Sequence, residues 1–251
     1  AFKKEFVEFE VSYDYSVKEN DKKNFLIIGN SHAEDLLKTL SFSYVNEQVN
    51  LNLWSPKKRE RDINYQVWEF DQFLNNCGVD CDMGTPDPNM VHQYSTADFI
   101  VLATKWSDKD IDSIFNIIRR VLSDGKQVIV VSNTPESLIF NNRFNRLDHF
   151  LFKVKNIERL TGSDLIALEK EFYSDYVKGQ SEINQKLKDI VEIFSDERVV
   201  YKDRSDYMCD RSEQMCYLYF PKDKAKVLWD YGHITSDGAR VLGRLITERM
   251  W

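Results

Sequence analysis

The sequence lacks several features that would assign it to a common protein class at once. Its longest apolar runs, such as residues 99–103, fall far short of the ~20 residues of a membrane-spanning helix. It has no excess of positive charge: 34 Lys and Arg stand against 41 Asp and Glu, and the net charge of -7 argues against a general nucleic-acid-binding protein. It has no Gly-rich phosphate loop, so a nucleotide-binding site has little support. With only 9 Gly and 5 Pro, it shows no obvious hinge between domains.

The start of the chain also lacks an initiator Met, an apolar signal-peptide core and a cleavage-site pattern. We therefore expect a piece of a longer protein, in which residues 1–23 form an N-terminal extension or linker. Residues 24–251 are enough for one large domain. Because the chain is 42% hydrophobic and 13% aromatic, it can bury a sizeable core.

Four cysteines occur in two close pairs, Cys77 with Cys81 and Cys209 with Cys216. An even number at short spacing favours two local disulfides and an oxidising compartment. A zinc site of four thiolates is an alternative, although the spacing of the second pair exceeds the usual two to four intervening residues. Four buried thiols are the other alternative.

Short apolar runs along the chain predict the strands of a sheet. The runs at 25–28, 99–103 and 128–131 are continuous and rich in β-branched residues, which is typical of parallel strands buried on both faces. Residues 49–53 alternate between apolar and polar, which predicts a half-exposed edge strand. A fifth strand is predicted at 199–201.

Amphipathic stretches separate these runs. Apolar residues recur at helical spacing over 111–122 and 183–194, and a final helix over 241–246 follows an N-cap cluster at 235–237. Residues 141–179 predict a long helical insertion. Strands that alternate with helices predict an α/β fold: a doubly wound, flavodoxin-like α/β/α sandwich of three layers with a central parallel sheet.

The most informative segment is Gly29-Asn30-Ser31-His32-Ala33, which directly follows the first predicted strand. In open α/β sheets ligands bind beyond the carboxyl ends of the strands, so Ser31 stands where function is expected. The N–H groups at the start of a helix can also stabilise an oxyanion. On this segment alone, a nucleophilic Ser31 and a Ser31 that merely caps the helix remain equally open.

A second segment, Asp230-x-x-His233, precedes the terminal helix. Asp and His three residues apart can share one face of a turn, where the carboxylate orients the imidazole toward a nucleophile. The pairing is weak by itself, because it also arises by chance. Its position in a chain that carries Ser31 after the first strand makes it informative.

Together these segments resemble a known family. Residues 29–33 are similar to the Gly-Asp-Ser-His block of SGNH hydrolases, and Asp230-x-x-His233-Ile234-Thr235 with Gly238-Ala239 is similar to their C-terminal block. The closer resemblance is to SGNH domains fused behind the transmembrane acyltransferase-3 domain of bacterial polysaccharide O-acyltransferases. These domains also carry a cysteine pair upstream of the C-terminal block, as Cys209 and Cys216 do here. The resemblance extends over about residues 24–250.

The resemblance implies a Ser-His-Asp triad in which Ser31 is the nucleophile, His233 the general base and Asp230 the residue that orients His233. Two departures from the family pattern stand out: Asn30 replaces an Asp, and the Gly-x-Asn-Asp block of many SGNH enzymes is not evident. The oxyanion donors beyond the backbone N–H of Ser31 are therefore open. The candidates for oxyanion or substrate binding are Gly78, Lys105, Trp106 and Asn133.

The implied function is O-acyl transfer, with acetyl expected, to a hydroxyl of a cell-surface polysaccharide such as O-antigen, through an acyl-serine. The resemblance implies no bound cofactor and no metal, because the acetyl-CoA-derived donor is delivered by the upstream membrane domain. It also implies a periplasmic location, tethered to the inner membrane. A carbohydrate O-acetylesterase and a catalytically silent glycan-binding module remain alternatives, the latter favoured by Asn30.

The remaining histidines and aromatics receive structural interpretations. We expect His32 to pack or cap locally, and His92 and His149 to be ordinary surface or satisfied residues. The aromatic clusters predict core rather than a sugar-binding platform, which an exposed Trp106 would suit better. The expected core aromatics are Trp54, Trp68, Phe70 and Phe73.

Overall fold

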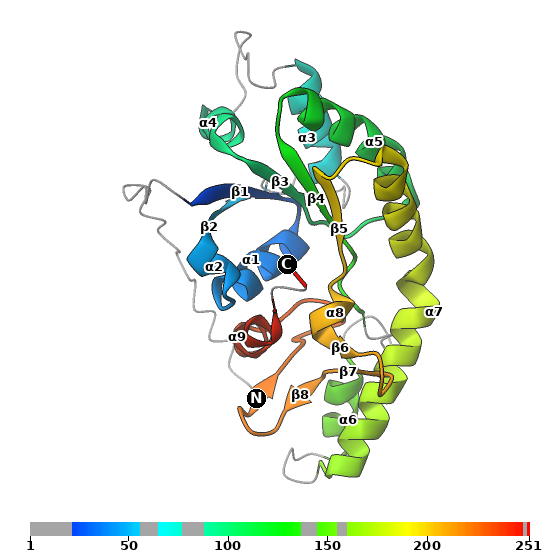
Figure 1. Cartoon of the computed structure of the whole chain (residues 1–251). Helices are drawn as coiled ribbons and strands as arrows, with labels where there is room; N and C mark the ends of the chain where they lie inside the picture. Colours follow the sequence, from blue (N-terminus) through cyan, green and yellow to red (C-terminus); the bar gives the residue numbers. More distant parts are fainter. Residues whose placement is uncertain (1–21, 56–64, 77–87, 137–144, 155–159, 248–249) are drawn as a thin grey trace.

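The computed structural model describes residues 22–55, 65–76, 88–136, 145–154, 160–247 and 250–251 (Figure 1). A five-stranded sheet lies at the centre, with the strand order β2-β1-β3-β4-β5 and every neighbouring pair parallel. The predicted α/β fold is confirmed, and each predicted strand is present. The strands are β1 (Lys23–Ile28), β2 (Val49–Trp54), β3 (Phe99–Leu102), β4 (Gln127–Val131) and β5 (Val199–Lys202).

The sheet is buried on both faces, because successive side chains of its strands belong alternately to two hydrophobic clusters. Within β1, Phe25 and Ile27 belong to one cluster, whereas Leu26 and Ile28 belong to the other. Complete burial of one such side chain contributes about 1.5 to 3 kcal/mol. Helices α1 (Ser31–Ser41) and α9 (Ser236–Leu245) cover the first face, and helices α3 (Tyr65–Asn76), α4 (Pro88–Thr96) and α5 (Asp108–Ser123) cover the second.

The predicted edge strand β2 lies at one edge of the sheet and is only partly buried along its whole length. The predicted core aromatics Phe70 and Phe73 are buried in the second cluster, and Trp54 packs against it. The side chain of Trp68 lies outside the described residues. Within the described ranges, no helix has the length and apolar character needed to cross a membrane.

One helix differs from the prediction in its extent. The stretch 141–179 contains α6 (Arg146–Val154) and the start of α7 (Gly162–Phe194), which runs without a break through Gly179 into the predicted helix 183–194. Gly179 therefore does not end a helix, because both sides of it pack against the body of the domain: Phe172 lies in the first cluster and Leu187 in the second. Figure 1 shows α7 running along one side of the molecule.

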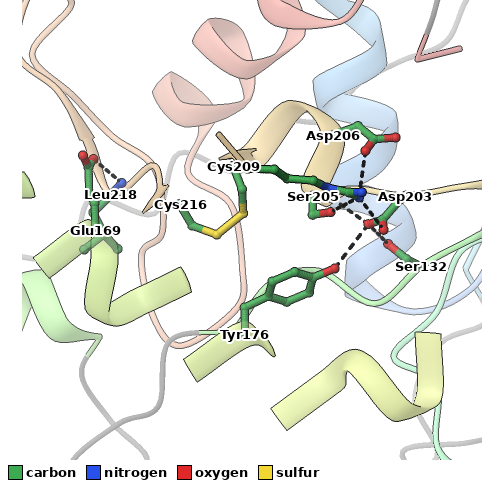
Figure 2. Close-up of a disulfide and its surroundings, with 10 residues drawn as sticks. Ser132, Glu169, Tyr176, Asp203, Ser205, Asp206, Cys209, Cys216 and Leu218 are labelled. Carbon is green, nitrogen blue, oxygen red and sulfur yellow. Dashed lines mark hydrogen bonds and ion pairs between the residues drawn. A yellow bond between two sulfur atoms is a disulfide. The ribbon is translucent and has the colours of Figure 1, made fainter. Parts of the chain in front are cut away.

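Between β5 and α9 the chain forms a short helix and two small hairpins. These are α8 (Ser205–Met208), the pair β6 (Cys209–Asp210) and β7 (Met215–Cys216), and the pair β8 (Tyr219–Phe220) and β9 (Ala225–Lys226). A disulfide joins Cys209 and Cys216 across the first hairpin, as expected (Figure 2). Cys77 and Cys81 lie outside the described residues. Buried Glu169 of α7 accepts the N–H of Leu218, which attaches this region to the long helix.

The turn after β1 requires a glycine. Gly29 has a φ of +154°, and a Cβ there would overlap the backbone carbonyl oxygen of Ala103. The N–H of Ala103 donates to the carbonyl oxygen of Ile28 at 2.9 Å, so the loop after β3 lies directly against this turn. Only a residue without a side chain allows the two backbones to approach this closely. The segments that follow β1 and β3 are therefore held against each other at the carboxyl ends of the two strands.

Candidate active site

The residue that caps the first helix is Asn30 and not Ser31. Asn30 is the N-cap residue, and its Oδ1 accepts the N–H of His32 at 3.0 Å. Ser31 is therefore the first residue of α1, and its hydroxyl is not used to cap the helix. The replacement of the family's Asp by Asn30 preserves this function, because both residue types cap helices well.

The structure brings Ser31, His233 and Asp230 together, although Ser31 and His233 are 202 residues apart in the sequence. The Oγ of Ser31 lies 2.7 Å from the Nε2 of His233, and the Nδ1 of His233 lies 2.7 Å from the Oδ2 of Asp230. The three side chains form a continuous hydrogen-bonded chain. His233 and Asp230 are largely buried, with side chains 17% and 15% exposed.

The loop that carries Asp230 and His233 is closed by its own backbone. Leu228 and Ile234 form an antiparallel bridge, and the N–H of Trp229 donates to the carbonyl oxygen of His233 at 3.0 Å. The Oδ1 of Asp230 accepts the N–H groups of residues 232 and 233 at 3.0 and 2.9 Å. Asp230 thus holds the loop with one oxygen and the imidazole with the other.

Two buried residues connect this loop to the rest of the domain. Asn145 donates from Nδ2 to the carbonyl oxygens of Leu228 and Asp230, at 3.0 and 3.1 Å. Asp35, one turn after Ser31 on α1, accepts the N–H of Ile234 at 3.0 Å. The helix that begins with Ser31 is therefore bonded directly to the residue that follows His233. Sequence reasoning missed both Asn145 and Asp35, since neither belongs to a motif.

The charges and hydrogen bonds of the site increase the proton affinity of the His233 imidazole. The hydrogen bond that His233 donates to Asp230 raises the pKa of His233 above its ordinary value of 6.5, and burial opposes this only in part. Burial disfavours the ionised form of Asp230, but the hydrogen bonds from His233 and from the backbone outweigh it, so the pKa of Asp230 is lowered. Asp230 therefore stays ionised and stabilises the imidazolium that forms when His233 accepts a proton.

His32 is a buried polar residue whose ring contacts the ring of His233. Burial, followed by the nearby charge of Arg204, lowers the pKa of His32 well below 6.5, so this ring is neutral. Its Nδ1 lies 2.9 Å from Thr134 Oγ1, and its carbonyl oxygen accepts from Nη2 of fully buried Arg204 at 3.0 Å. His32 packs locally rather than facing a substrate, and His92 is exposed on α4.

Two of the four predicted oxyanion or substrate residues are excluded by their contacts. Trp106 is buried, and its indole N–H donates to the carbonyl oxygen of Val131, so it is neither exposed nor available to a sugar. Asn133 is buried too, and both ends of its amide bond the backbone of Trp106. Both residues instead stabilise the loop after β3. Contrary to the prediction, both side chains lie in the interior.

The other two candidates have different outcomes. Lys105 lies beside the site: its Nζ is 2.7 Å from Glu136 Oε1 and 4.7 Å from the centre of the Tyr231 ring. Gly78 lies outside the described residues. In the ranges that the structure describes, no group of three or more His, Cys, Asp and Glu residues could hold a metal ion.

The rim of the site contains aromatic residues that the motif analysis did not assign. The rings of Trp229 and Tyr231 both contact the ring of His233, with centroid distances of 5.4 and 5.7 Å. Trp229 is 59% exposed. The only signal for it in the sequence is its position next to Asp230.

The chain is similar to one known protein family and to several solved structures. None of the curated proteins matches the sequence. Solved structures with similar folds include a candidate acylhydrolase from Bacteroides fragilis NCTC 9343, at 14% identity and a TM-score of 0.48, covering 92% of this chain and 88% of that chain. They also include a GDSL-like lipase from Bacteroides thetaiotaomicron VPI-5482, at 10% identity and a TM-score of 0.44, covering 88% and 84%. The family model "SGNH domain (fused to AT3 domains)" matches residues 6–248. The chain therefore belongs to the family of SGNH domains that are fused to AT3 domains.

Proposed function

We propose that this domain transfers an acyl group, in the simplest case acetyl, to a hydroxyl of a cell-surface polysaccharide through an acyl-serine at Ser31. The observation that supports the proposal most directly is the hydrogen-bonded chain from Ser31 through His233 to Asp230. The family match supports the same class of chemistry, acyl hydrolysis or transfer. The acceptor and the acyl group are inferences from the family resemblance.

In the first half of the reaction, the Oγ of Ser31 attacks the carbonyl carbon of the donor while Nε2 of His233 takes the hydroxyl proton. The tetrahedral intermediate collapses when its bond to the leaving group breaks, and His233 returns the proton to the leaving group. The negative charge of Asp230 stabilises the imidazolium in between. Both partners already lie at hydrogen-bond distance, so little reorganisation is needed.

The tetrahedral intermediate needs hydrogen-bond donors for its oxyanion. The N–H of Ser31 lies in the first turn of α1, where N–H groups have no helical carbonyl to bond and the helix dipole is positive. We assign it as one donor. Lys105 stays a candidate for contacting substrate from the rim, since its ammonium group is close to the loop that carries His233.

In the second half, a sugar hydroxyl gives its proton to His233 while its oxygen attacks the carbonyl carbon of the acyl-serine. The bond to the Oγ of Ser31 then breaks, and His233 returns the proton to that Oγ. We infer that the donor is acetyl-CoA-derived, that the AT3 membrane domain upstream in the full-length protein delivers it, and that the SGNH domain acts in the periplasm, tethered to the inner membrane. The fusion named by the family model and the Cys209–Cys216 disulfide support this location.

Hydrolysis of sugar acetates is a second function that one observation favours. Ser31 is only partly buried, so water can reach an acyl-serine when no sugar is present. The two activities share every step except the identity of the final nucleophile.

The test is hydrolysis of p-nitrophenyl acetate by wild type and by Ser31→Ala and His233→Ala. Matched controls are Ser123→Ala at the end of α5 and His92→Ala on α4, both exposed. Loss of activity in the first pair alone supports the proposed roles. Activity that survives Ser31→Ala refutes the acyl-serine. Incubation of wild type with the full-length protein's polysaccharide and an acetyl donor then separates transfer from hydrolysis.

A further inference from the structure

Trp229 is exposed to solvent and also contacts His233. It is 59% exposed, and its indole stacks on the imidazole of His233 with an interplanar angle of 27°. Exposure of an indole to water is unfavourable, because a tryptophan gains stability from burying its large apolar surface. A mere prop for His233 would not need this open surface beside the reacting atoms.

Hydrogen bonds hold the backbone of the loop that carries the indole. The backbone N–H of Trp229 donates to the carbonyl oxygen of His233, and the bridge between Leu228 and Ile234 closes the loop on both sides. Asn145 holds the carbonyl oxygens of Leu228 and Asp230 from below. A ligand that binds this indole therefore does not have to order the loop, which lowers the cost of binding.

The loop that carries the indole also lies close to polar groups. Tyr231 of this loop contacts the ring of His233 too, and Lys105 lies over the Tyr231 ring while paired with Glu136 at 2.7 Å. An ammonium group can donate hydrogen bonds, and a carboxylate can accept them. The rim around His233 thus contains an exposed apolar plane, a donor and an acceptor. A pyranose has the complementary form, with an apolar C–H face and a rim of hydroxyls.

We propose that Trp229 is the stacking platform for the sugar ring whose hydroxyl exchanges the acyl group at Ser31. This inference rests on the proposed function, because it places the acceptor of that reaction. By microscopic reversibility, the same platform binds the sugar when a sugar acetate is the acyl donor and the sugar is the leaving group. The platform that the sequence suggested at Trp106 is thus located at Trp229, on the loop before α9.

The test compares two acetate esters that share the acyl group and differ in the leaving group: β-D-glucose pentaacetate and ethyl acetate. Acetate release is measured for wild type, Trp229→Ala, Trp229→Phe and the control Ile193→Ala. Ile193 is 66% exposed near the end of α7 that leads into β5, an edge strand that β3 and β4 separate from β1, the strand before Ser31. Trp229→Ala should lower the ratio of the two kcat/KM values, sugar ester over ethyl ester, about tenfold.

Trp229→Phe keeps an aromatic face and should keep the ratio within about threefold of wild type. The ratio for Ile193→Ala should equal that of wild type. Equal losses on both esters in Trp229→Ala would overturn the platform, since the indole would then only position His233. A wild-type domain that hydrolyses ethyl acetate but not the sugar ester would overturn it too. Ethyl acetate hydrolysis that survives Ser31→Ala would instead refute the proposed function.

A binding measurement makes the platform testable without catalysis. Saturation-transfer NMR with methyl β-D-glucopyranoside should show transfer to the protons of one sugar face in wild type and in Ser31→Ala. The transfer should be lost in Trp229→Ala. Its absence in wild type, or its persistence in Trp229→Ala, would overturn the platform and leave the role of Ser31 untouched.

Discussion

Asp230→Asn is the substitution whose consequence follows most directly from the geometry. The wild-type carboxylate accepts three hydrogen bonds: one from the ring of His233 through Oδ2, and two from the backbone of residues 232 and 233 through Oδ1. An asparagine can keep the two backbone bonds only if its carbonyl oxygen occupies the Oδ1 position. Its NH₂ group then faces Nδ1 of His233. The opposite orientation would set an NH₂ group against two N–H donors.

The NH₂ group can bond to Nδ1 only if that nitrogen carries no proton. The proton of the neutral imidazole must then lie on Nε2, which faces the Oγ of Ser31 at 2.7 Å. In this tautomer His233 cannot accept the proton of Ser31. Because the loss is of general-base catalysis and of a charge beside the imidazolium, kcat should fall ~1,000- to 10,000-fold, which is about 4 to 5.5 kcal/mol in activation free energy.

The assay is p-nitrophenyl acetate hydrolysis as a function of pH, with thermal unfolding as the control. Removal of the carboxylate also lowers the pKa of His233, so the acidic limb of the residual activity should move to lower pH. The unfolding midpoint should stay close to that of wild type, because both backbone bonds survive. A variant with more than a tenth of wild-type kcat and an unmoved acidic limb would refute the assigned role of Asp230.

Three further predictions concern the pH profile and the fold. In wild type, kcat/KM should be lost as pH falls through a midpoint above 6.5, because Asp230 raises the pKa of His233; a midpoint below 6.5 would contradict the assignment. Gly29→Ala should lower the free energy of unfolding by about 3 kcal/mol or more, because the new Cβ meets the carbonyl of Ala103. An unchanged midpoint of urea unfolding would contradict this. Replacing Cys209 and Cys216 by Ser should lower the free energy of unfolding by about 2 kcal/mol, the amount expected for a separation of 7 residues. A smaller loss, measured by calorimetry, would mean that packing alone holds the hairpin.

The fold was predictable because its signals are local and repeated. A strand buried on both faces must be apolar at every position, as 25–28 and 128–131 are, and an edge strand such as 49–53 alternates. The extent of α7 was not predictable at Gly179. Glycine weakens a helix by only about 1 kcal/mol. Packing of the helix on both sides of Gly179 outweighs that amount.

In the candidate site too, some residues were predictable from local patterns and others were not. Asp230 and His233 are three residues apart, so a local motif shows them, and the turn at Gly29 marks Ser31 as a residue just after a strand. The residues that connect these segments come from elsewhere in the chain. Asn145 precedes α6, and Asp35 bonds Ile234 across 199 positions. No spacing rule relates such partners, because their proximity depends on how α1, α6 and the terminal loop pack.

By itself the sequence determined the class of fold, the order of strands and helices, and the three residues proposed to carry the chemistry, since each of these is written in a periodicity or a short motif. Only the tertiary structure decided which of the remaining polar and aromatic residues reach the site. Trp106 and Asn133 follow buried strands as closely as Ser31 does, yet they face the interior. Trp229 lies beside a catalytic motif and stays in solvent. Burial depends on contacts among segments distant in sequence, and local patterns do not encode it.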